Sequence, residues 1–534
     1  MNKKSLGSYY TPIRLANFIA DYCLENFDQD VISILEPSVG DGNFAAAISN
    51  NNQLDRFQNI NLTLVERELN ELNKAIDRCN PIVNLNSIHS DYLDFHNSDD
   101  NLYSLIIGNP PYVKSSLLTD EQKDLCKSIH IDSGLKDKKI NNIWTSFLVS
   151  AIQKIENNGV IAFVLPLELL QVKFSEEIRD LLKSSFDRLE VFMFDELQFQ
   201  ECKGQDTVLI VGYNQHQEQG TYYTTIKNIE ELENRSFNLM QNVSVSESNT
   251  KWTHHFLSPD EHQFLENLKS QLNLTTKYVE NKAGIVTAAN DYFIVNDEVV
   301  TKNRLRSYSK PIVQKGFYVN GSVTFENEDF QKLVEENKPA YLLDFNKANP
   351  SKLSNNIVNY LKIGTDRELE TRFKCRQRKH WYQVPNIAKQ SEAFFFKRAH
   401  EYPKLLKNNA AAYVTDSAYM IEPKDGYLIE NIIFSFYNSL TLAFAELEGR
   451  YYGGGVLEIT PNEFRALPLP YAFVNNFEVY KQNFKNKLNI AEILSKYNTE
   501  ILNSALDLNS EEIDKIEGIR RKLVSRRQKN NKIV

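Results

Sequence analysis

The chain has 534 residues, a mass of 61.8 kDa and a formal net charge of −9 at pH 7, with 42% hydrophobic and 25% charged residues. This composition is typical of a globular chain with room for about two to four domains, and it excludes collagen-like, disordered and disulfide-scaffold proteins. Five scattered cysteines without CxxC spacing, and the lack of an apolar run long enough for a membrane span, predict an intracellular protein without a cysteine metal site.

Residues 31–214 alternate between short apolar runs and longer stretches that can form crossover helices. The expected strands include 32–35, 62–65, 105–107, 160–165, 189–194 and 208–211. This alternation predicts a parallel sheet with helices on both faces. The polar stretch 215–251 is expected to be a boundary between residues 1–250 and 251–534, and helices are expected from Phe477 onward.

The segment 34–44 predicts a strand, a loop containing Gly40 and Gly42, and the start of a helix near Phe44. Glycines allow the backbone to approach a ligand at the carboxyl edge of a first strand, although a tight strand-to-helix turn is an alternative interpretation. Glu66 ends the next expected strand, where a carboxylate can accept hydrogen bonds from both ribose hydroxyls. Asp91 follows a third strand and could accept from an adenine amino group, so we expect a cofactor that contains adenosine.

The tetrapeptide Asn109-Pro-Pro-Tyr112 directly follows the apolar strand around 105–107. Two prolines remove backbone donors and restrict the turn, so the side-chain oxygen of Asn109 and the carbonyl of Pro110 can both accept from one amino group. Tyr112 then offers an aromatic face to the planar base that carries the amine. A rigid turn with a capping asparagine is the alternative.

The basic residues gather in the second half of the chain. Residues 372–407 contain ten Lys/Arg against two Glu, and residues 519–534 contain seven Lys/Arg and no acid. Such a field attracts phosphates, although a solvated helix face is the alternative interpretation. Cations and aromatics in segment 372–407 suit phosphate contact and insertion between bases, while the aromatic triplet 394–396 is expected in a core. The DNA-binding candidates are Arg372, Lys374, Arg376, Arg378, Lys379, Trp381, Lys397 and Arg398.

In chain order, Glu36-Pro37-x-x-Gly40-x-Gly42, Glu66, Asp91 and Asn109-Pro-Pro-Tyr112 resemble the motifs of S-adenosylmethionine-dependent DNA amino-methyltransferases. Segment 7–12 precedes the glycine loop and resembles the motif that touches the methionine end of the cofactor. With the recognition region last, this order is similar to that of the gamma-class, TaqI-like adenine methyltransferases of restriction-modification systems. The resemblance implies an α/β fold with a Rossmann-like seven-stranded methyltransferase domain at 1–250 and a mixed α+β target-recognition domain at 251–534.

The resemblance also implies roles for single residues. The cofactor-binding residues would be Thr11, Pro12, Glu36, Pro37, Gly40, Gly42, Phe44, Glu66, Asp91 and Asn109. The catalytic residues would be Asn109, Pro110, Pro111, Tyr112 and Phe199, with Phe199 packed against the flipped base opposite Tyr112. S-Adenosylmethionine is the implied cofactor, no metal is expected, and the implied reaction is methylation of the exocyclic amino group of a flipped-out adenine in duplex DNA.

The resemblance places the chain in the cytoplasm of a prokaryotic cell, in restriction-modification or phage defence. Duplex DNA is the expected partner, a separate restriction endonuclease is left open as a second partner, and no membrane is expected. Two alternatives remain open: a methyltransferase acting on RNA or protein glutamine, and a catalytically silent DNA-recognition subunit. A fused endonuclease is not expected, because the cofactor motif begins the chain.

Overall fold

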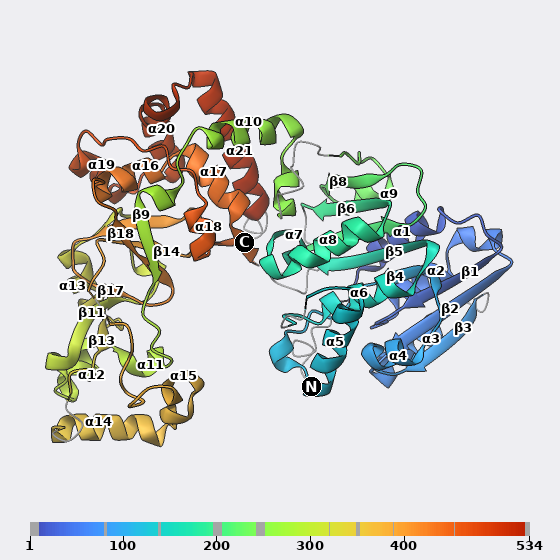
Figure 1. Ribbon diagram of the computed structural model, residues 1–534, viewed down its shortest axis with the longest axis horizontal. Coiled ribbons are helices and arrows are strands. Elements are labelled where there is room, and N and C mark those ends of the chain that lie inside the picture. Colours follow the sequence, from blue (N-terminus) through green and yellow to red (C-terminus); the bar gives the residue numbers. More distant parts are fainter. Residues whose placement is uncertain are drawn as a thin grey trace. The chain divides into compact units, whose positions relative to one another are not determined.

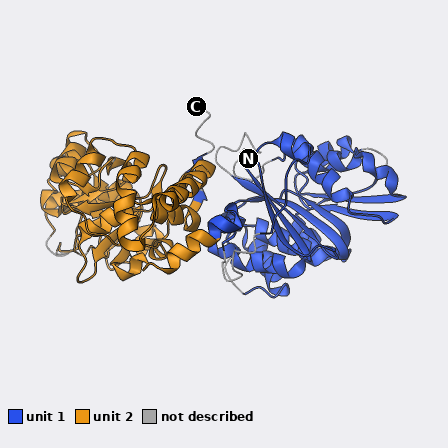
Figure 2. Cartoon of the chain, turned by 90° about the horizontal axis from the view of Figure 1, so that it is seen from above, with its two compact units in different colours: residues 1–262, 451–455, 528–534 blue, residues 263–450, 456–527 orange. Residues whose placement is uncertain are grey.

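A computed structural model of the chain describes residues 10–79, 83–136, 140–195, 206–241, 251–319, 321–348, 353–387, 389–452 and 454–528 (Figure 1). The chain forms two compact units (Figure 2). Unit 1 comprises residues 1–262 with 451–455 and 528–534, and unit 2 comprises 263–450 with 456–527. None of the helices in the described ranges is long and apolar enough to span a membrane.

Unit 1 is built on an eight-stranded sheet with the order β3-β2-β1-β4-β5-β7-β6-β8. The strands are β1 Val31–Glu36, β2 Asn59–Glu66, β3 Asn84–His89, β4 Tyr103–Gly108, β5 Ile155–Pro166, β6 Arg188–Phe194, β7 Thr207–Tyr213 and β8 Gly220–Ile226. The central strands β4, β6 and β7 are buried along their whole length, which explains their continuous apolar runs. The edge strand β3 is polar and has no fully buried residue.

Helices cover both faces of this sheet, as the alternating pattern predicts (Figure 1). One face is packed by α1 Ile13–Leu24, α2 Asn43–Ser49, α3 Leu69–Arg78 and α9 Ile229–Glu233. The helices α4 Tyr92–Ser98, α5 Asp120–Asp132, α6 Trp144–Lys154 and α8 Glu176–Ser185 pack together in a second layer, and a short helix α7 Glu168–Gln171 follows β5. The α/β, Rossmann-like prediction is therefore confirmed.

Two details of the sheet differ from the prediction. The sheet is mixed and not parallel, because β7 runs antiparallel to both β5 and β6. The polar stretch 215–251 is not simply a boundary, since it supplies β8, which pairs with β6 along its whole length. Thr and Tyr side chains give β8 its strand character despite the low apolar content. The sheet therefore has eight strands and not seven.

Unit 2 contains a four-stranded sheet, β10-β13-β11-β17, and a five-stranded sheet, β12-β16-β14-β18-β9. Their strands are β9 Val279–Ala283, β10 Ile294–Val295, β11 Ser309–Val313, β12 Thr324–Phe325, β13 Tyr341–Leu343, β14 Ala393–Phe396, β16 Lys404–Asn408, β17 Tyr413–Val414 and β18 Ala418–Pro423. Two further strands of unit 2 are β15 Arg398–Ala399 and β20 Val456–Glu458, whereas β19 Arg450–Tyr452 begins at the last residue of 263–450 and continues into residues 451–455 of unit 1. The aromatic triplet 394–396 forms the centre of β14 and is buried, as expected.

Helices surround these sheets, and the last three of them follow one another at the C-terminal end of unit 2 (Figure 1). They are α10 Pro259–Ser270, α11 Asn290–Phe293, α12 Asp297–Lys302, α13 Asn327–Glu335, α14 Asn355–Asp366, α15 Phe373–Arg376, α16 Ile429–Phe436, α17 Ser439–Glu448 and α18 Pro461–Arg465. The last three are α19 Phe477–Lys485, α20 Ile490–Leu506 and α21 Ser510–Gln528, which confirms the helical end expected from Phe477. The mixture of small sheets and helices agrees with the predicted α+β character of the second half.

Candidate active site

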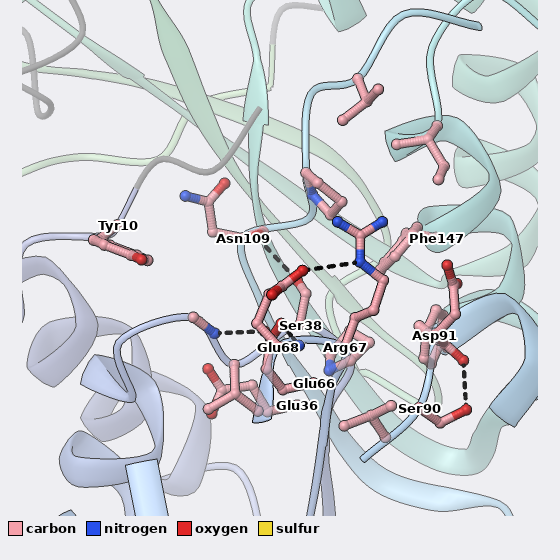
Figure 3. Close-up of a pocket in the computed structure, with 18 of the residues that line it drawn as sticks. Tyr10, Glu36, Ser38, Glu66, Arg67, Glu68, Ser90, Asp91, Asn109 and Phe147 are labelled. Carbon is pink, nitrogen blue, oxygen red and sulfur yellow. Dashed lines mark hydrogen bonds and ion pairs between the residues drawn. The ribbon is translucent and has the colours of Figure 1, made fainter. Parts of the chain in front are cut away.

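A pocket of about 190 Å³ lies where the carboxyl ends of β1, β2, β3 and β4 meet (Figure 3). Glu36 and the glycine loop come from β1, Glu66 from β2, Asp91 from β3 and Asn109 from β4. Parallel strands bring their carboxyl ends to one edge, and the loops that follow them diverge there. Residues far apart in the sequence therefore line one cavity.

The glycine loop has the backbone geometry that its sequence predicts. Gly40 and Gly42 adopt left-handed conformations, with φ of +57° and +79°. A Cβ at Gly42 would lie 2.6 Å from Cα of Ala75, so only glycine lets α2 approach α3 this closely. A Cβ at Gly40 would lie 3.0 Å from the ring of Tyr10, which lines the same pocket.

Glu66 and Asp91 are held in place by N–H donors. The two carboxylate oxygens of Glu66 accept hydrogen bonds from the backbone N–H groups of Gly40 and Glu68, each at 2.9 Å. Asp91 caps α4 by accepting from the N–H of Leu93 at 3.0 Å, and its other oxygen accepts from Nε2 of Gln122 at 2.8 Å. Each carboxylate oxygen has more than one acceptor direction, so both groups can accept further hydrogen bonds from a ligand.

Glu36 and Thr11 differ from these two carboxylates because their buried polar atoms lack partners. Both carboxylate oxygens of Glu36 and the hydroxyl of Thr11 are shielded from solvent and make no hydrogen bond within the described residues. Burial raises the pKa of Glu36 well above its ordinary value, and the nearby charges of Glu66 and Asp41 raise it further. Unpartnered buried polar groups cost free energy, and a ligand with hydrogen-bond donors would remove that cost.

The tetrapeptide that follows β4 is fixed from two sides. The backbone carbonyl of Asn109 accepts from the hydroxyl of Ser38 at 3.2 Å, which ties the turn to the glycine loop (Figure 3). The hydroxyl of Tyr112 donates to the carbonyl of Val164 on β5 at 3.0 Å, and only 8% of Tyr112 is exposed. Asn109 and Pro111 line the pocket. A rigid turn thus carries amide and carbonyl acceptors beside the cavity.

The structure brings together most of the residues that the sequence analysis assigned to a cofactor. The pocket is lined by Thr11, Glu36, Pro37, Gly40, Phe44, Glu66, Asp91 and Asn109. Pro12, which precedes α1, and Gly42, which precedes α2, support the loops without lining the cavity. Pro110 and Tyr112 lie in the same turn but outside the lining, and Phe199 lies outside the described residues.

Sequence reasoning missed several pocket residues. Phe147 on α6 and Gln122 on α5 line the cavity, together with Leu117, Leu118 and Ser90. Phe147 is 4% exposed and its ring lies 4.7 Å from that of Tyr92. Ser90 directly precedes Asp91, so its place in the pocket could be predicted from the sequence. Residues on α5 and α6 carry no local signal, because their place in the pocket depends on how these helices pack.

The predicted DNA-binding residues lie in two kinds of environment, and three of them have partners within the protein. Trp381 is partly buried and packs against an aromatic core, with 5.5 Å between its ring centroid and that of Tyr292. Arg378 donates to the carbonyl of Thr287 at 2.7 Å, and burial lowers its pKa. Arg398 pairs with Glu458 at 2.8 Å. These three candidates therefore have structural partners.

Three other members of the predicted set are exposed cations, and the remaining two are partly engaged or partly buried. Lys374, Arg376 and Lys379 are exposed and have no acidic group within 4.0 Å among the residues that the structure describes. Arg372 donates to the carbonyl of Ala288 at 3.1 Å, and Lys397 is half-buried. In the basic tail, Arg520 and Arg521 pair with Glu517 on their own helix.

Two family models match the chain. Residues 23–199 match the Eco57I restriction-modification methylase, and residues 249–502 match the C-terminal domain of the type II methyltransferase M.Eco57I. Among curated relatives, the type II methyltransferase M.AccI of Acinetobacter calcoaceticus is 25% identical over 399 residues, which cover 72% of this chain and 70% of M.AccI. The type II methyltransferase M.BanIII of Aneurinibacillus aneurinilyticus is 24% identical over 212 residues, which cover 36% of each chain.

A solved structure with the same fold is that of the type IIL restriction-modification enzyme MmeI in complex with DNA. The two chains superpose with a TM-score of 0.58 at 13% identity, and the match covers 96% of this chain and 75% of MmeI. At this identity the similarity establishes the fold of the chain. The match includes both halves of the sequence, so the likeness extends beyond the Rossmann-like sheet.

Proposed function

We propose that this chain, a type II restriction-modification DNA methyltransferase of the Eco57I type, transfers the methyl group of S-adenosylmethionine to the N6 amino group of a flipped-out adenine in duplex DNA. The observation that carries this proposal is the position of Asn109-Pro-Pro-Tyr112 at the end of β4, beside a pocket lined by Glu36, Glu66 and Asp91. One turn thereby offers two acceptors for an amino group next to a site suited to adenosine.

The hydrogen-bond acceptors of the pocket suit S-adenosylmethionine. Glu66 would accept from the ribose hydroxyls and Asp91 from the adenine amino group, while Phe147, which lines the same pocket, would offer an aromatic wall. The unpartnered oxygens of Glu36 and Thr11 suit the ammonium of the methionine end. When bound, S-adenosylmethionine supplies an electrophilic methyl group on a positively charged sulfur.

The turn after β4 would act on the target amine. The side-chain oxygen of Asn109 and the carbonyl of Pro110 accept the two amino hydrogens, which favours a tetrahedral nitrogen with its lone pair directed at the methyl group. The same acceptors stabilise the positive charge that develops on nitrogen. Because the turn is held by Ser38 and Val164, its acceptors need little reorganisation.

The target base must leave the duplex to reach this turn, at a cost of a few kcal/mol in stacking and pairing. Stacking on Tyr112 is proposed to recover about 1–3 kcal/mol of that cost. The motif order, with Thr11 ahead of the glycine loop and the recognition region last, supports the gamma, TaqI-like class. The proposed partner is duplex DNA in a prokaryotic cytoplasm.

Sequencing with modified-base detection tests the proposal directly. DNA from cells that express the chain is expected to carry N6-methyladenine at one short motif, and DNA from cells that express Asn109→Ala is expected to carry none. Modification of cytosine instead of adenine would overturn the adenine assignment. Unmodified DNA, combined with methyl transfer from labelled cofactor to RNA or protein by the purified chain, would overturn the assignment of DNA as substrate.

A further inference from the structure

One exposed turn in unit 2 combines an unpaired cationic surface with an exposed aromatic ring. This turn, here called the α15 turn, comprises residues 372–379 and contains five Lys/Arg and no acid, in a chain with a net charge of −9. It lies near α14 and α11 (Figure 1). Within it, Lys374, Arg376 and Lys379 are the exposed cations without an acidic partner among the described residues.

Phe373 opens α15 and is 65% exposed. Most phenylalanines in this chain are buried, including the triplet 394–396. An exposed phenylalanine costs solvation free energy, and here it is flanked by Arg372 and Lys374. An aromatic ring between cations is the arrangement by which proteins insert a wedge between stacked bases while contacting the neighbouring phosphates.

Two buried side chains and two hydrogen bonds anchor the α15 turn. Cys375 and Leu369 are completely buried beneath it. Arg372 donates to the carbonyl of Ala288 at 3.1 Å, and Arg378 donates to the carbonyl of Thr287 at 2.7 Å. These two arginines fix both ends of the turn to one loop, so Phe373 is presented on a rigid support. A wedge must be rigid to separate stacked bases, because a mobile side chain would fold back on the surface.

A groove of about 500 Å³ lies beside the turn. Its lining includes Lys374, Lys379, Gln377 and Gln383. These side chains offer cationic and amide donors, which suit phosphate oxygens and base edges, and the groove contains no carboxylate among its described lining residues. The groove and the exposed cations therefore favour the same kind of partner, a polyanion with aromatic bases.

The rest of the basic segment does not share these properties. Arg398 pairs with Glu458, and Lys407 pairs closely with Glu430. Both cations would have to give up a partner before they could bind phosphate. The structure thus separates Arg398 and Lys407, which have acidic partners, from Lys374, Arg376 and Lys379 of the α15 turn, which have none among the described residues.

We propose that the α15 turn enters duplex DNA, with Phe373 inserted between two neighbouring bases and Lys374, Arg376 and Lys379 on the adjoining phosphates. This inference rests on the proposed function, because it takes duplex DNA as the substrate. It adds which residues of unit 2 engage the DNA and that the duplex is locally unstacked by a side chain away from the target base.

The first experiment tests whether Phe373 separates neighbouring bases of the duplex. Full-length wild type, Phe373→Ala and Phe373→Trp are titrated with a duplex that contains the methylated motif and 2-aminopurine at successive positions. Wild type and Phe373→Trp are expected to raise the fluorescence at one step distinct from the methylated adenine. Phe373→Ala is expected to lose that signal and to bind about tenfold more weakly, as is usual when an aromatic stacked on a base is removed. Phe473→Ala is the control, because Phe473 is 75% exposed in the same unit and lies outside the basic segment.

The second experiment tests whether the three exposed cations contact phosphates, by measuring how DNA affinity depends on salt. The triple variant Lys374→Gln, Arg376→Gln, Lys379→Gln is compared with the triple variant Lys332→Gln, Lys485→Gln, Lys487→Gln, which removes three exposed lysines elsewhere in unit 2. Each lost phosphate contact lowers the slope of log affinity against log salt by about one, so the first variant is expected to lose about three units and the control close to none.

The outcomes separate this inference from the proposed function. If wild type methylates DNA but both α15-turn variants keep its affinity, salt slope and fluorescence, the inference is wrong and the function stands. If both triple variants lose the same slope, the attraction is a general effect of charge and the inference is also wrong. If wild type neither binds nor methylates DNA, the proposed function itself fails. Unchanged cofactor binding by each variant shows that unit 1 is intact.

Discussion

The carboxylates of the pocket illustrate how residues of one type are used differently. Glu66 and Asp91 already accept N–H hydrogen bonds, so they are oriented before a ligand arrives. Glu36 is buried with both oxygens unpartnered, so it has a solvation cost that a bound cation would relieve. Glu66 and Asp91 are therefore held in a fixed orientation, whereas Glu36 can attract a bound cation.

Asn109→Ala is the first residue-scale prediction. Loss of the amide oxygen removes one of two proposed acceptors for the target amine, so the rate of methyl transfer should fall by about 10²–10³-fold or more. Cofactor affinity should change far less, because Asn109 is one of many residues in the pocket wall. Single-turnover transfer of labelled methyl groups and calorimetric cofactor binding measure the two effects. Asn50→Ala, at an exposed position after α2, is the control. Full activity of Asn109→Ala would exclude the proposed mechanism.

Glu36→Gln is the second prediction at the residue scale. The pKa of Glu36 is raised in the folded chain, so between its ordinary pKa and this raised pKa the folded state binds more protons than the unfolded state. The free energy of unfolding contributed by Glu36 therefore falls as pH rises through that window. Without cofactor at pH 8, Glu36→Gln should melt about 2–4 °C higher than wild type, while binding cofactor more weakly.

The control for Glu36→Gln is Asp124→Asn, which neutralises an exposed carboxylate on α5. It should leave both the melting temperature and cofactor affinity unchanged. A lower melting temperature for Glu36→Gln at pH 8 would show that the buried carboxylate is stabilised by a partner and does not carry a solvation cost.

At the scale of elements, loops at the carboxyl ends of four strands make the pocket, and the helices on both faces hold those loops. Because Gly42 in the glycine loop has no Cβ, α2 can approach α3 closely at Ala75. The α5 helix reaches the pocket through Gln122, whose side chain binds Asp91 and whose backbone belongs to a capping box with Thr119. A substitution at a contact between these helices should therefore alter cofactor binding in the pocket.

Gly42→Ala tests this coupling, with Gly134→Ala as a matched control. Both glycines have similar positive φ, +79° and +74°, but a Cβ at Gly134 would have nothing within 4 Å. Gly134→Ala should cost only the strain of the left-handed backbone, about 1–2 kcal/mol. Gly42→Ala should cost more and should also weaken cofactor binding, measured by thermal melting and calorimetry. Equal effects of the two variants would rule out the close approach of α2 to α3 as the reason for Gly42.

The end of α21 depends on a buried ion pair. Arg527 is fully buried, donates to both carboxylate oxygens of Glu446 at 2.7 and 2.8 Å, and also donates to the carbonyl of His400. Arg527→Met removes the cation from a buried carboxylate and should destabilise unit 2 by about 3–5 kcal/mol in denaturant unfolding. Arg521→Met removes an exposed cation paired with Glu517, and should cost below about 1 kcal/mol. Similar costs for the two would contradict the buried pair.

At the scale of the whole molecule, the acidic net charge conceals a local basic surface. The chain carries −9 overall, while residues 372–407 hold ten Lys/Arg against two Glu. Long-range repulsion of DNA by the acidic regions and short-range attraction by the basic surface are both screened by salt, but direct phosphate contacts also release counterions. Counterion release should therefore dominate the salt dependence of DNA binding.

DNA affinity of the full chain should fall steeply with salt. Each phosphate contact contributes a slope of about −0.9 to a plot of log affinity against log salt, so three or more contacts predict a slope of about −3 or steeper. Fluorescence anisotropy between about 50 and 200 mM salt measures the slope, and circular dichroism at both limits checks that the chain remains folded. A flat plot would exclude phosphate contacts as a source of affinity.

Much of unit 1 could be predicted from its sequence. Apolar runs of strand length indicate β1, β4, β5, β6 and β7 because these strands are buried on both faces. Polar residues at the ends of the apolar runs of β2 and β4 identify Glu66 and Asn109, and Asp91 follows the polar edge strand β3, since the carboxyl ends of parallel strands must meet at one edge. The antiparallel direction of β7 and the presence of β8 could not be predicted, because the first follows from chain connection and the second from pairing with β6.

The sequence by itself determined the order of the motifs, the strand-to-loop positions of the candidate site and the presence of a basic segment, because each depends on neighbouring residues. Only the tertiary structure decided that Phe147 and Gln122 complete the pocket, that Trp381 packs against a core, and that Lys374, Arg376 and Lys379 are exposed without an acidic partner among the described residues. Burial and ion pairing depend on groups distant in the sequence, so a local pattern shows which charges exist but not which are neutralised.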